Sequence, residues 1–390
     1  MKNLIGLFIL AALSFAIGGA EFGILAGVGL SLVAEVQPTG VFMMSIPAAD
    51  VRNVFTKTLI ATYRQEISVM SFLRSFFPAV ESKSKEVSIQ VQLGKELVAV
   101  DVERGTNGNR NKMVKSTEKI ILPPYYYEYM TTNEHRLYDV AIGTQDVGVM
   151  NTLVSELASE MMEMQKKIER RYELQCAQVL ETGIVTLNNG TNIDYSRAAA
   201  SLVDVSGTNP WATGGNDPIT DFVNACKFLR EIGKAPGGRF LAICGEDAIL
   251  DLLNNSTFQA KADIKNFDMD QVRKPAMSNG ASYHGTITAG SYTVDLWTYP
   301  EVYETESAAG VITQVNYINA KKVIVMPHAP NFKLAFAAVP NLIGQPAQQG
   351  AYLAGDYVDN RKTAHEAWIK SAGVAVPVAV NQVYTMQVVA

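Results

Sequence analysis

Histidine and cysteine are scarce in this sequence of 390 residues. Its three cysteines, Cys176, Cys226 and Cys244, lie far apart and form no CxxC pair, so neither a disulfide framework nor a cysteine zinc site is predicted. We interpret them as reduced thiols of an intracellular protein. The four histidines also lack the HxxxH or HExxH spacing that places two imidazoles on one helical face. The sequence therefore predicts no metal site.

A surplus of positive charge is absent too. Lysine and arginine number 33 and the acidic residues 38, which gives a net charge of −5. Such a chain has no overall electrostatic attraction to phosphate, which argues against a dedicated DNA or RNA binder. With 48% hydrophobic and 18% charged residues, the composition is that of a globular protein, and the length allows two or three domains.

Motifs for catalysis and for cofactor binding are also missing. The CGED junction at residues 244–247 has the form of a strand running into a helix, but its two carboxylates would repel a phosphate. No Walker lysine, GxGxxG run or GxSxG elbow occurs, and Asp268 and Asp270 fit no calcium loop. We therefore expect no catalytic residues, no cofactor and no enzyme activity. The alternative is an enzyme whose catalytic residues are dispersed along the chain, because a search for local motifs does not detect such residues.

The N-terminus is unusually apolar. Residues 3–20 carry no charge, and after Glu21 the apolar run resumes over residues 22–34. Such a length could cross a membrane, and Lys2 followed by an apolar stretch and small residues also resembles a secretory signal. Three interpretations stay open: a cleaved signal, a membrane anchor, and a glycine-rich arm buried against another subunit.

The hydrophobic periodicity changes at Pro78. Before this proline, apolar residues recur at mixed helical spacing over residues 51–77, which predicts one or two helices. Beyond it, alternation of apolar and polar residues predicts the strands of a long two-stranded ribbon, at 87–93, 98–102 and 120–122.

This ribbon, taken as residues 83–127, has a charge opposite to that of the whole chain, with eight basic and five acidic residues. A two-stranded ribbon exposes its edges and buries little apolar surface, so another element must cover it. We predict that a neighbouring copy of the chain does so, and a sheet within the same chain is the alternative. The candidate contact residues between subunits are Arg104, Arg110, Lys112 and Lys115.

The longest predicted element is a helix over residues 147–181. It contains no proline, and its apolar residues recur every three or four positions, as on a helix with one buried face. At 1.5 Å per residue it would run roughly 50 Å, long enough to be the spine of an extended subunit. Leu157 and Met161 lie on the apolar stripe and are predicted to face the core.

After a polar loop at 188–217, the sequence predicts an α/β arrangement. A helix at 219–232, a strand at 239–244 and a helix at 247–253 follow one another. Further strands are predicted at 293–298, 311–318, 323–326, 367–369 and 383–389.

The order of these elements resembles that of the major capsid proteins of tailed bacteriophages, and more closely the lambda-type major head protein family. The resemblance covers residues 60–390, whereas residues 1–35 depart from the family pattern. Six short segments carry it: FLRSFF at 72–77, AVDVER at 99–104, ILPP at 121–124, RFLAIC at 239–244, VIVM at 323–326 and IKSA at 369–372.

The resemblance implies an α+β chain with the tailed-phage major capsid fold. This fold has an N-terminal arm, an extended β-hairpin loop, a long spine helix with a peripheral sheet, and an axial α/β domain. The implied segments are an arm or leader (1–50), a helical segment (51–80), the extended loop (81–130), the peripheral domain with the spine helix (131–216), the axial domain (217–350) and C-terminal strands (351–390).

The resemblance also implies a major capsid protein that assembles into the icosahedral shell around phage double-stranded DNA. The implied partners are further copies in hexamers and pentamers, scaffold, portal and decoration proteins, and packaged DNA bound without sequence specificity, but no membrane. The implied location is the virion capsid, assembled in the host cytoplasm. Two alternatives stay open: an encapsulin-like nanocompartment shell, and a membrane-anchored or exported protein that uses residues 1–35 as signal or anchor.

Overall fold

The computed structural model describes residues 69–92, 116–133, 146–187, 191–208, 210–212, 216–264, 279–306, 310–340, 347–359 and 364–390. The apolar leader, the predicted strand at 98–102, the four candidate contact residues and the pair Asp268 and Asp270 lie outside these ranges. The chain divides into two compact units. Unit 1 comprises Met1–Ala61, Met130–Glu160 and Ala354–Trp368, and unit 2 comprises Thr62–Tyr129, Met161–Leu353 and Ile369–Ala390.

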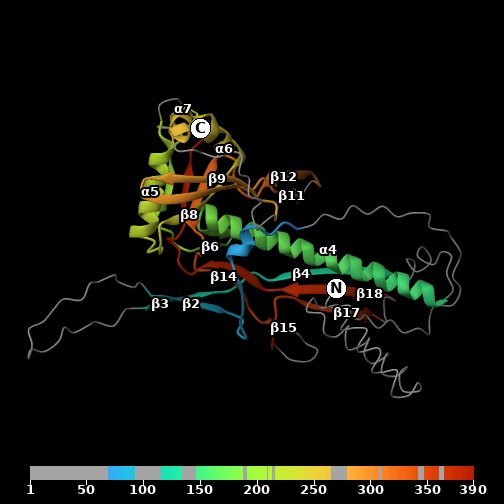
Figure 1. Cartoon of the computed structure of the whole chain (residues 1–390). Helices are drawn as coiled ribbons and strands as arrows, with labels where there is room; N and C mark the ends of the chain where they lie inside the picture. Colours follow the sequence, from blue (N-terminus) through green and yellow to red (C-terminus); the bar gives the residue numbers. More distant parts are fainter. Residues whose placement is uncertain are drawn as a thin grey trace, which may run out of the picture. The chain divides into compact units, whose positions relative to one another are not determined.

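Unit 2 contains a six-stranded mixed sheet with the strand order β7-β20-β13-β8-β10-β9 (Figure 1). Strand β8 is parallel to β10 and antiparallel to β13, and its last five residues are buried. In the order of the sheet, the strands are Leu202–Asp204, Tyr384–Gln387, Lys322–Pro327, Arg239–Cys244, Tyr292–Thr298 and Ser282–Ala289.

Helices α5 (Pro218–Glu231) and α6 (Glu246–Asn254) pack on this sheet, and α7 (Ser256–Ile264) follows α6. Helix α5 begins at Asp217, whose side chain accepts a hydrogen bond from the backbone N–H of Ile219 (3.2 Å), and a proline occupies its first turn. The core that the helices share with the sheet contains the fully buried side chains of Trp211, Phe222, Phe240, Leu252 and Leu296.

A second sheet of unit 2 has the order β1-β14-β19, with β1 at Ala79–Glu81, β14 at Phe332–Phe336 and β19 at Gly373–Pro377. Aromatic rings join this sheet to helix α4 (Asp146–Glu181) and to Phe77, which follows the 3₁₀ turn η1 (Leu73–Phe76). The centroids of the stacked Phe77 and Phe332 rings lie 4.9 Å apart, and the Tyr172 and Phe336 rings form a T-shaped pair with centroids 5.4 Å apart.

Helix α4 spans Asp146–Glu181 and contributes to both units. It confirms the predicted helix to within one residue. Within unit 2, the buried residues of the predicted stripe recur every four positions from Ile168 to Leu180, and Met161, seven residues before Ile168, is buried too; the side chain of Leu157 lies outside the description. The buried set on this stripe is Met161, Ile168, Tyr172, Cys176 and Leu180.

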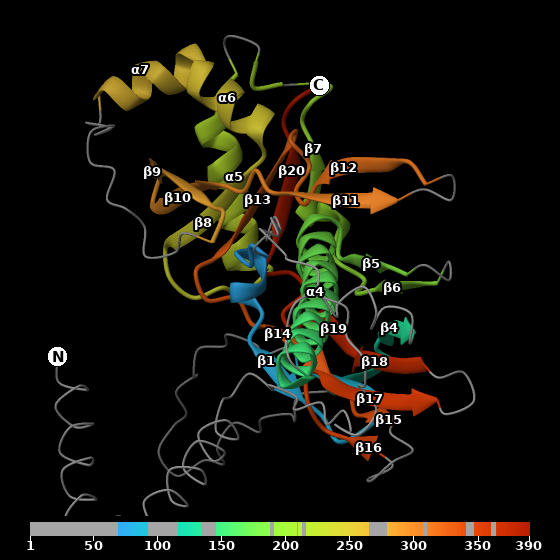
Figure 2. The same cartoon turned by 90° about the vertical axis from the view of Figure 1, so that its right-hand side faces the viewer.

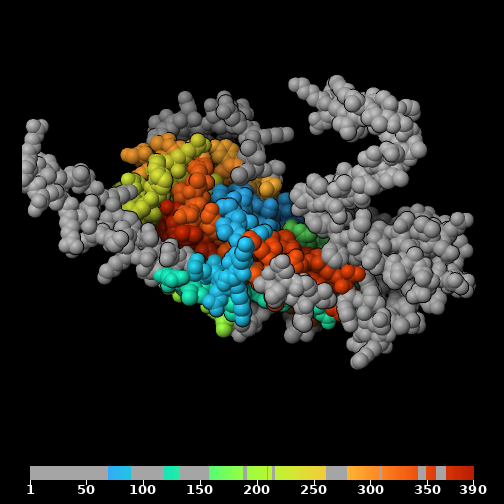
Figure 3. Space-filling model, turned by 90° about the horizontal axis from the view of Figure 1, so that it is seen from below, coloured from blue at the N-terminus to red at the C-terminus, as the bar shows by residue number. Residues whose placement is uncertain are grey.

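The predicted ribbon is present as the antiparallel pair β2 (Val87–Gln92) and β3 (Ser116–Ile121). Seen from below in Figure 3, its blue and teal residues lie side by side on the surface of unit 2. Other two-stranded sheets are β5 (Ile184–Thr186) with β6 (Asn192–Asp194), β11 (Val302–Glu306) with β12 (Ile312–Asn316), and β15 (Val339–Pro340) with β16 (Ala347–Gln348). A further sheet has the order β17-β18-β4, formed by Leu353–Asp359, Ala364–Ser371 and Tyr126–Asn133.

One prediction from the sequence is wrong. The segment 188–217 is not a plain loop, because it contains β6, the turn η2 (Ala199–Ser201) and β7, and β7 finds its partner in the distant strand β20. Of the predicted helical segment 51–77, only residues 69–77 are described, so the prediction stays open for the rest. These residues contain the 3₁₀ turn η1, whose backbone N–H groups at Leu73 and Arg74 donate to a side chain of α4.

Candidate assembly surfaces

A buried carboxylate attaches the segment that leads to the ribbon to helix α4. Glu173 of α4 has no exposed surface. Its Oε1 accepts hydrogen bonds from the backbone N–H of Leu73 (2.8 Å) and the hydroxyl of Tyr299 (3.0 Å), and its Oε2 accepts one from the N–H of Arg74 (3.0 Å). The first N–H groups of a helical turn lack partners within the turn, so the carboxylate satisfies groups that would otherwise be buried unpaired.

The burial that makes Glu173 a good anchor also changes its acidity. Desolvation raises the pKa of Glu173 to about 7, although the N–H groups of Leu73 and Arg74 and the Tyr299 hydroxyl act in the opposite direction. The anchor therefore changes its charge state close to neutral pH.

Beyond this anchor, the ribbon β2–β3 carries uncovered apolar side chains. Ile120 is 62% exposed, and Leu122, just after β3, is 56% exposed. Near its base the ribbon contacts the unit, because Lys119 donates through Nζ to the carbonyl oxygen of Asp194 and lies 5.8 Å from the ring of Tyr195. Within the described part of the chain, β2 and β3 pair only with each other. The ribbon thus has a surface that a further partner can cover.

Three tyrosines extend this surface toward β4. Tyr125, Tyr127 and Tyr129 alternate with less exposed neighbours, so their side chains lie on one face. They are 47%, 43% and 58% exposed, the rings of Tyr127 and Tyr129 stack at 5.6 Å, and Lys370 lies over Tyr127 at 4.9 Å. Clustered aromatic residues at a surface are typical of protein interfaces.

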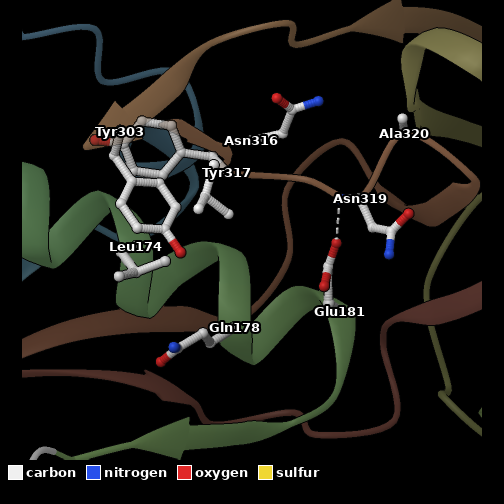
Figure 4. Close-up of a pocket in the computed structure, with 9 residues that line it drawn as sticks. Leu174, Gln178, Glu181, Tyr303, Asn316, Tyr317, Asn319 and Ala320 are labelled. Atoms are coloured by element: carbon white, nitrogen blue, oxygen red, sulfur yellow. Dashed lines mark hydrogen bonds between the residues drawn. The ribbon is translucent and has the colours of Figure 1, made fainter. Parts of the chain in front are cut away.

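A pocket of about 410 Å³ lies between α4 and the hairpin β11–β12 (Figure 4). In it, the backbone N–H of Asn319 donates to Oε1 of Glu181 (2.5 Å), and Lys322 Nζ lies 3.6 Å from Oε2 of the same residue. The lining therefore combines aromatic rings and amides with a carboxylate that already has two partners. The lining residues are Leu174, Gln178, Glu181, Tyr303, Val315, Asn316, Tyr317, Asn319 and Ala320.

A second buried charge lies in the six-stranded sheet. Asp295 of β10 is 2% exposed, and its Oδ2 accepts from Arg239 (2.9 Å from Nε) and His328 (2.8 Å from Nε2), while its Oδ1 accepts from the hydroxyl of Thr286 (2.6 Å). Burial by itself would raise the pKa of Asp295, but the hydrogen bonds from His328, Thr286 and Arg239 outweigh it and hold the pKa below its usual value. This carboxylate ties neighbouring strands together.

In the part of the chain that the structure describes, His, Cys, Asp and Glu side chains form no group of three that would hold a metal ion. None of the helices in the described ranges combines the length and apolar character needed to cross a membrane.

Comparison with known proteins assigns the chain to a family. A family model described as phage major capsid protein E matches residues 55–386. The chain belongs to this family of phage major capsid proteins. The α+β capsid fold and the function as a major capsid protein, both implied by the sequence resemblance, are thereby confirmed.

Solved structures similar to this capsid protein share little sequence with it. A prophage capsid protein of Escherichia coli CFT073 has 13% identity and a TM-score of 0.57, over 83% of this chain and 94% of that chain. The mature capsid of bacteriophage PhiM1 has 10% identity and a TM-score of 0.46, over 88% and 98%. The SrpI encapsulin of Synechococcus elongatus PCC 7942 has 11% identity and a TM-score of 0.40, over 85% and 93%. No curated protein sequence matches the chain.

The predicted contact residues Arg104, Arg110, Lys112 and Lys115 of this capsid protein lie outside the described ranges, so their role stays a prediction. Sequence reasoning missed the anchor Glu173 and the tyrosine face. Both left a signal, since Glu173 is an acidic residue immediately beside the apolar stripe and three tyrosines alternate over residues 125–129.

Proposed function

We propose that this capsid protein assembles with itself into the hexamers and pentamers of a closed icosahedral shell around phage double-stranded DNA, as a structural protein without catalytic activity. The observation that supports this proposal is the uncovered ribbon: Ile120 and Leu122 are exposed, and among the described residues β2 and β3 pair only with each other. A two-stranded ribbon of this kind is marginally stable by itself. A neighbouring copy that covers the ribbon stabilises it and thereby forms a contact between subunits.

The basic side chains Arg104, Arg110, Lys112 and Lys115 of the ribbon contribute to this contact. An exposed ion pair contributes only about 0–1 kcal/mol. Because a shell repeats the same contact in every subunit, assembly becomes sensitive to salt.

The remaining partners follow from the capsid role. Scaffold, portal and decoration proteins bind the shell. The packaged DNA is enclosed without sequence-specific binding, and a net charge of −5 suits a wall that does not grip the DNA tightly. Assembly takes place in the host cytoplasm, and the mature protein resides in the virion capsid.

Electron microscopy of the purified protein tests the proposal. We expect closed shells from the parent chain and folded but unassembled subunits from the triple variant Arg104→Glu, Arg110→Glu, Lys112→Glu. The triple glutamine variant at these positions should be intermediate, and Lys227→Glu on α5 serves as a remote control. If the triple glutamate variant assembles like the parent at low and high salt, the basic side chains are solvated and make no contact between subunits. Shells that contain protein cargo in place of DNA would instead favour a nanocompartment.

A further inference from the structure

The hairpin β11–β12 is a second two-stranded element whose surface is uncovered. Ile312 is 62% exposed, Val302 44% and Val315 40%. Within the described part of the chain, its strands pair only with each other. Figure 2 shows the hairpin projecting to the right, away from strands β13 and β20 of the six-stranded sheet. Two strands alone bury too little apolar surface for a stable hairpin, so a covering partner would stabilise it.

The exposed surface of this hairpin is acidic as well as apolar. Residues 299–320 contain three glutamates and no lysine, arginine or histidine. The strand register places Glu304 opposite Gln314 and Glu306 opposite Ile312, so both carboxylates share a face with an exposed isoleucine. The other face, with Tyr303 and Val315, borders the pocket beside α4 (Figure 4). A partner that fits this hairpin must therefore be apolar and basic.

The chain itself contains such a partner. The ribbon of residues 83–127 has eight basic and five acidic residues, and residues 93–115, which connect β2 to β3, include Arg104, Arg110, Lys112 and Lys115. In Figure 1, β2–β3 leaves unit 2 toward the lower left, whereas β11–β12 extends to the right near the top. Because the two elements leave the same unit on different sides, a contact between them joins two copies of the chain.

We propose that the hairpin β11–β12, with Glu304 and Glu306, is the docking surface for the basic connection 93–115 of a neighbouring subunit. The inference rests on the proposed function and adds the acceptor surface to it. A contact between two different surfaces of identical subunits is heterologous, and repetition of such a contact closes a ring when the rotation allows it. Opposite charges on the two surfaces select the correct partner and increase the rate of encounter.

A charge exchange tests the inference. The variant Glu304→Lys, Glu306→Lys should yield folded subunits and few or no shells by sedimentation and electron microscopy. The variant with Arg104→Glu, Arg110→Glu and Lys112→Glu should behave in the same way, and the combination of all five changes should restore shell formation. Circular dichroism of the unassembled variants verifies their folding, and the variant Glu231→Lys, Asp251→Lys on helices α5 and α6 is the matched control for acid reversal.

Cross-linking gives a second, independent measurement on the parent chain. Shells assembled from a mixture of ¹⁴N and ¹⁵N chains are treated with a carbodiimide, which joins carboxylates to lysine amines in direct contact. We expect Glu304 or Glu306 joined to Lys112 or Lys115, with one partner of each isotope. Three results would each overturn the inference: shells without this cross-link, a Glu304→Lys, Glu306→Lys variant that assembles like the parent, or a variant with all five substitutions that fails to regain assembly. A parent chain that forms no shells would instead contradict the proposed function.

Discussion

At the scale of single residues, the burial of Glu173 links the stability of the subunit to pH. The pKa of its carboxyl group is about 7 in the folded protein, above the ordinary value of 4.5. Between these two values the folded state holds a proton that the unfolded state has released, so stability decreases as the pH rises from about 4.5 to about 7. At 1.36 kcal/mol per pKa unit, the full effect is about 3 kcal/mol.

Glu173→Gln tests this linkage. The variant cannot titrate, so its unfolding midpoint Tm should decrease less than that of the parent between pH 5 and pH 8. The variant should also be less stable at pH 5, by about 1–3 kcal/mol, because the glutamine amide faces a backbone N–H with a donor. Thermal unfolding followed by circular dichroism measures both effects, and identical pH profiles of parent and variant would show that Glu173 is not the titrating group.

Gly245 is required for a close approach of two backbone segments. A Cβ at this position would overlap the backbone carbonyl oxygens of Asn319 and Ala320, and backbone atoms cannot yield as a flexible side chain does. This steric need accounts for the glycine that precedes helix α6, where the sequence pattern alone allowed comparison with a phosphate loop.

We expect Gly245→Ala to destabilise the subunit by about 1–3 kcal/mol or more, since overpacking strains a closely packed region. The matched control is Gly207→Ala, because a Cβ on Gly207 meets no atom within 4 Å. Urea unfolding of the two variants gives the comparison, and equal stabilities would contradict the close approach.

At the scale of elements, helix α4 acts as the spine of unit 2 because one of its faces is buried along several turns. Ile168 is 2% exposed on this face, whereas Met162, six residues earlier, is 56% exposed. Ile168→Asp would bury an unpaired charge, which costs several kcal/mol. We expect insoluble protein from Ile168→Asp and soluble, folded protein from Met162→Asp. Equal soluble yields of the two variants would show that the face assignment is wrong.

At the scale of the whole molecule, the apolar leader leads to a prediction about the assembled particle. Residues 1–35 are apolar, yet they are rich in glycine and interrupted by Glu21, which suits neither a well-specified helix nor an uninterrupted membrane span. We predict that the leader is retained and buried in the shell.

Intact-mass measurement on native particles checks this prediction. A mature N-terminus near Glu21 would establish processing and contradict a buried arm. Cell fractionation adds a second observation, because shells sediment as large soluble particles, whereas an anchored protein remains in a membrane pellet until detergent dissolves it.

The sequence by itself determined those features that repeat within one element. The apolar stripe of α4 reflects the 3.6 residues per turn of a helix, and the alternation in β2 reflects the two-residue side-chain period of a strand. Both patterns are local, and both elements have the predicted type. The order of these elements along the chain also sufficed to indicate the capsid family, because a shared fold preserves element order even where identity is as low as 13%.

Only the tertiary structure decided which distant groups meet. The anchor joins Glu173 to Leu73 across 100 residues, and β7 becomes a strand because β20, far along the chain, supplies its hydrogen bonds. The hairpin β11–β12 could be identified as an acidic, uncovered surface only after the register had set its faces. Buried polar groups must find partners wherever the chain brings them, and a local pattern carries no information about those partners.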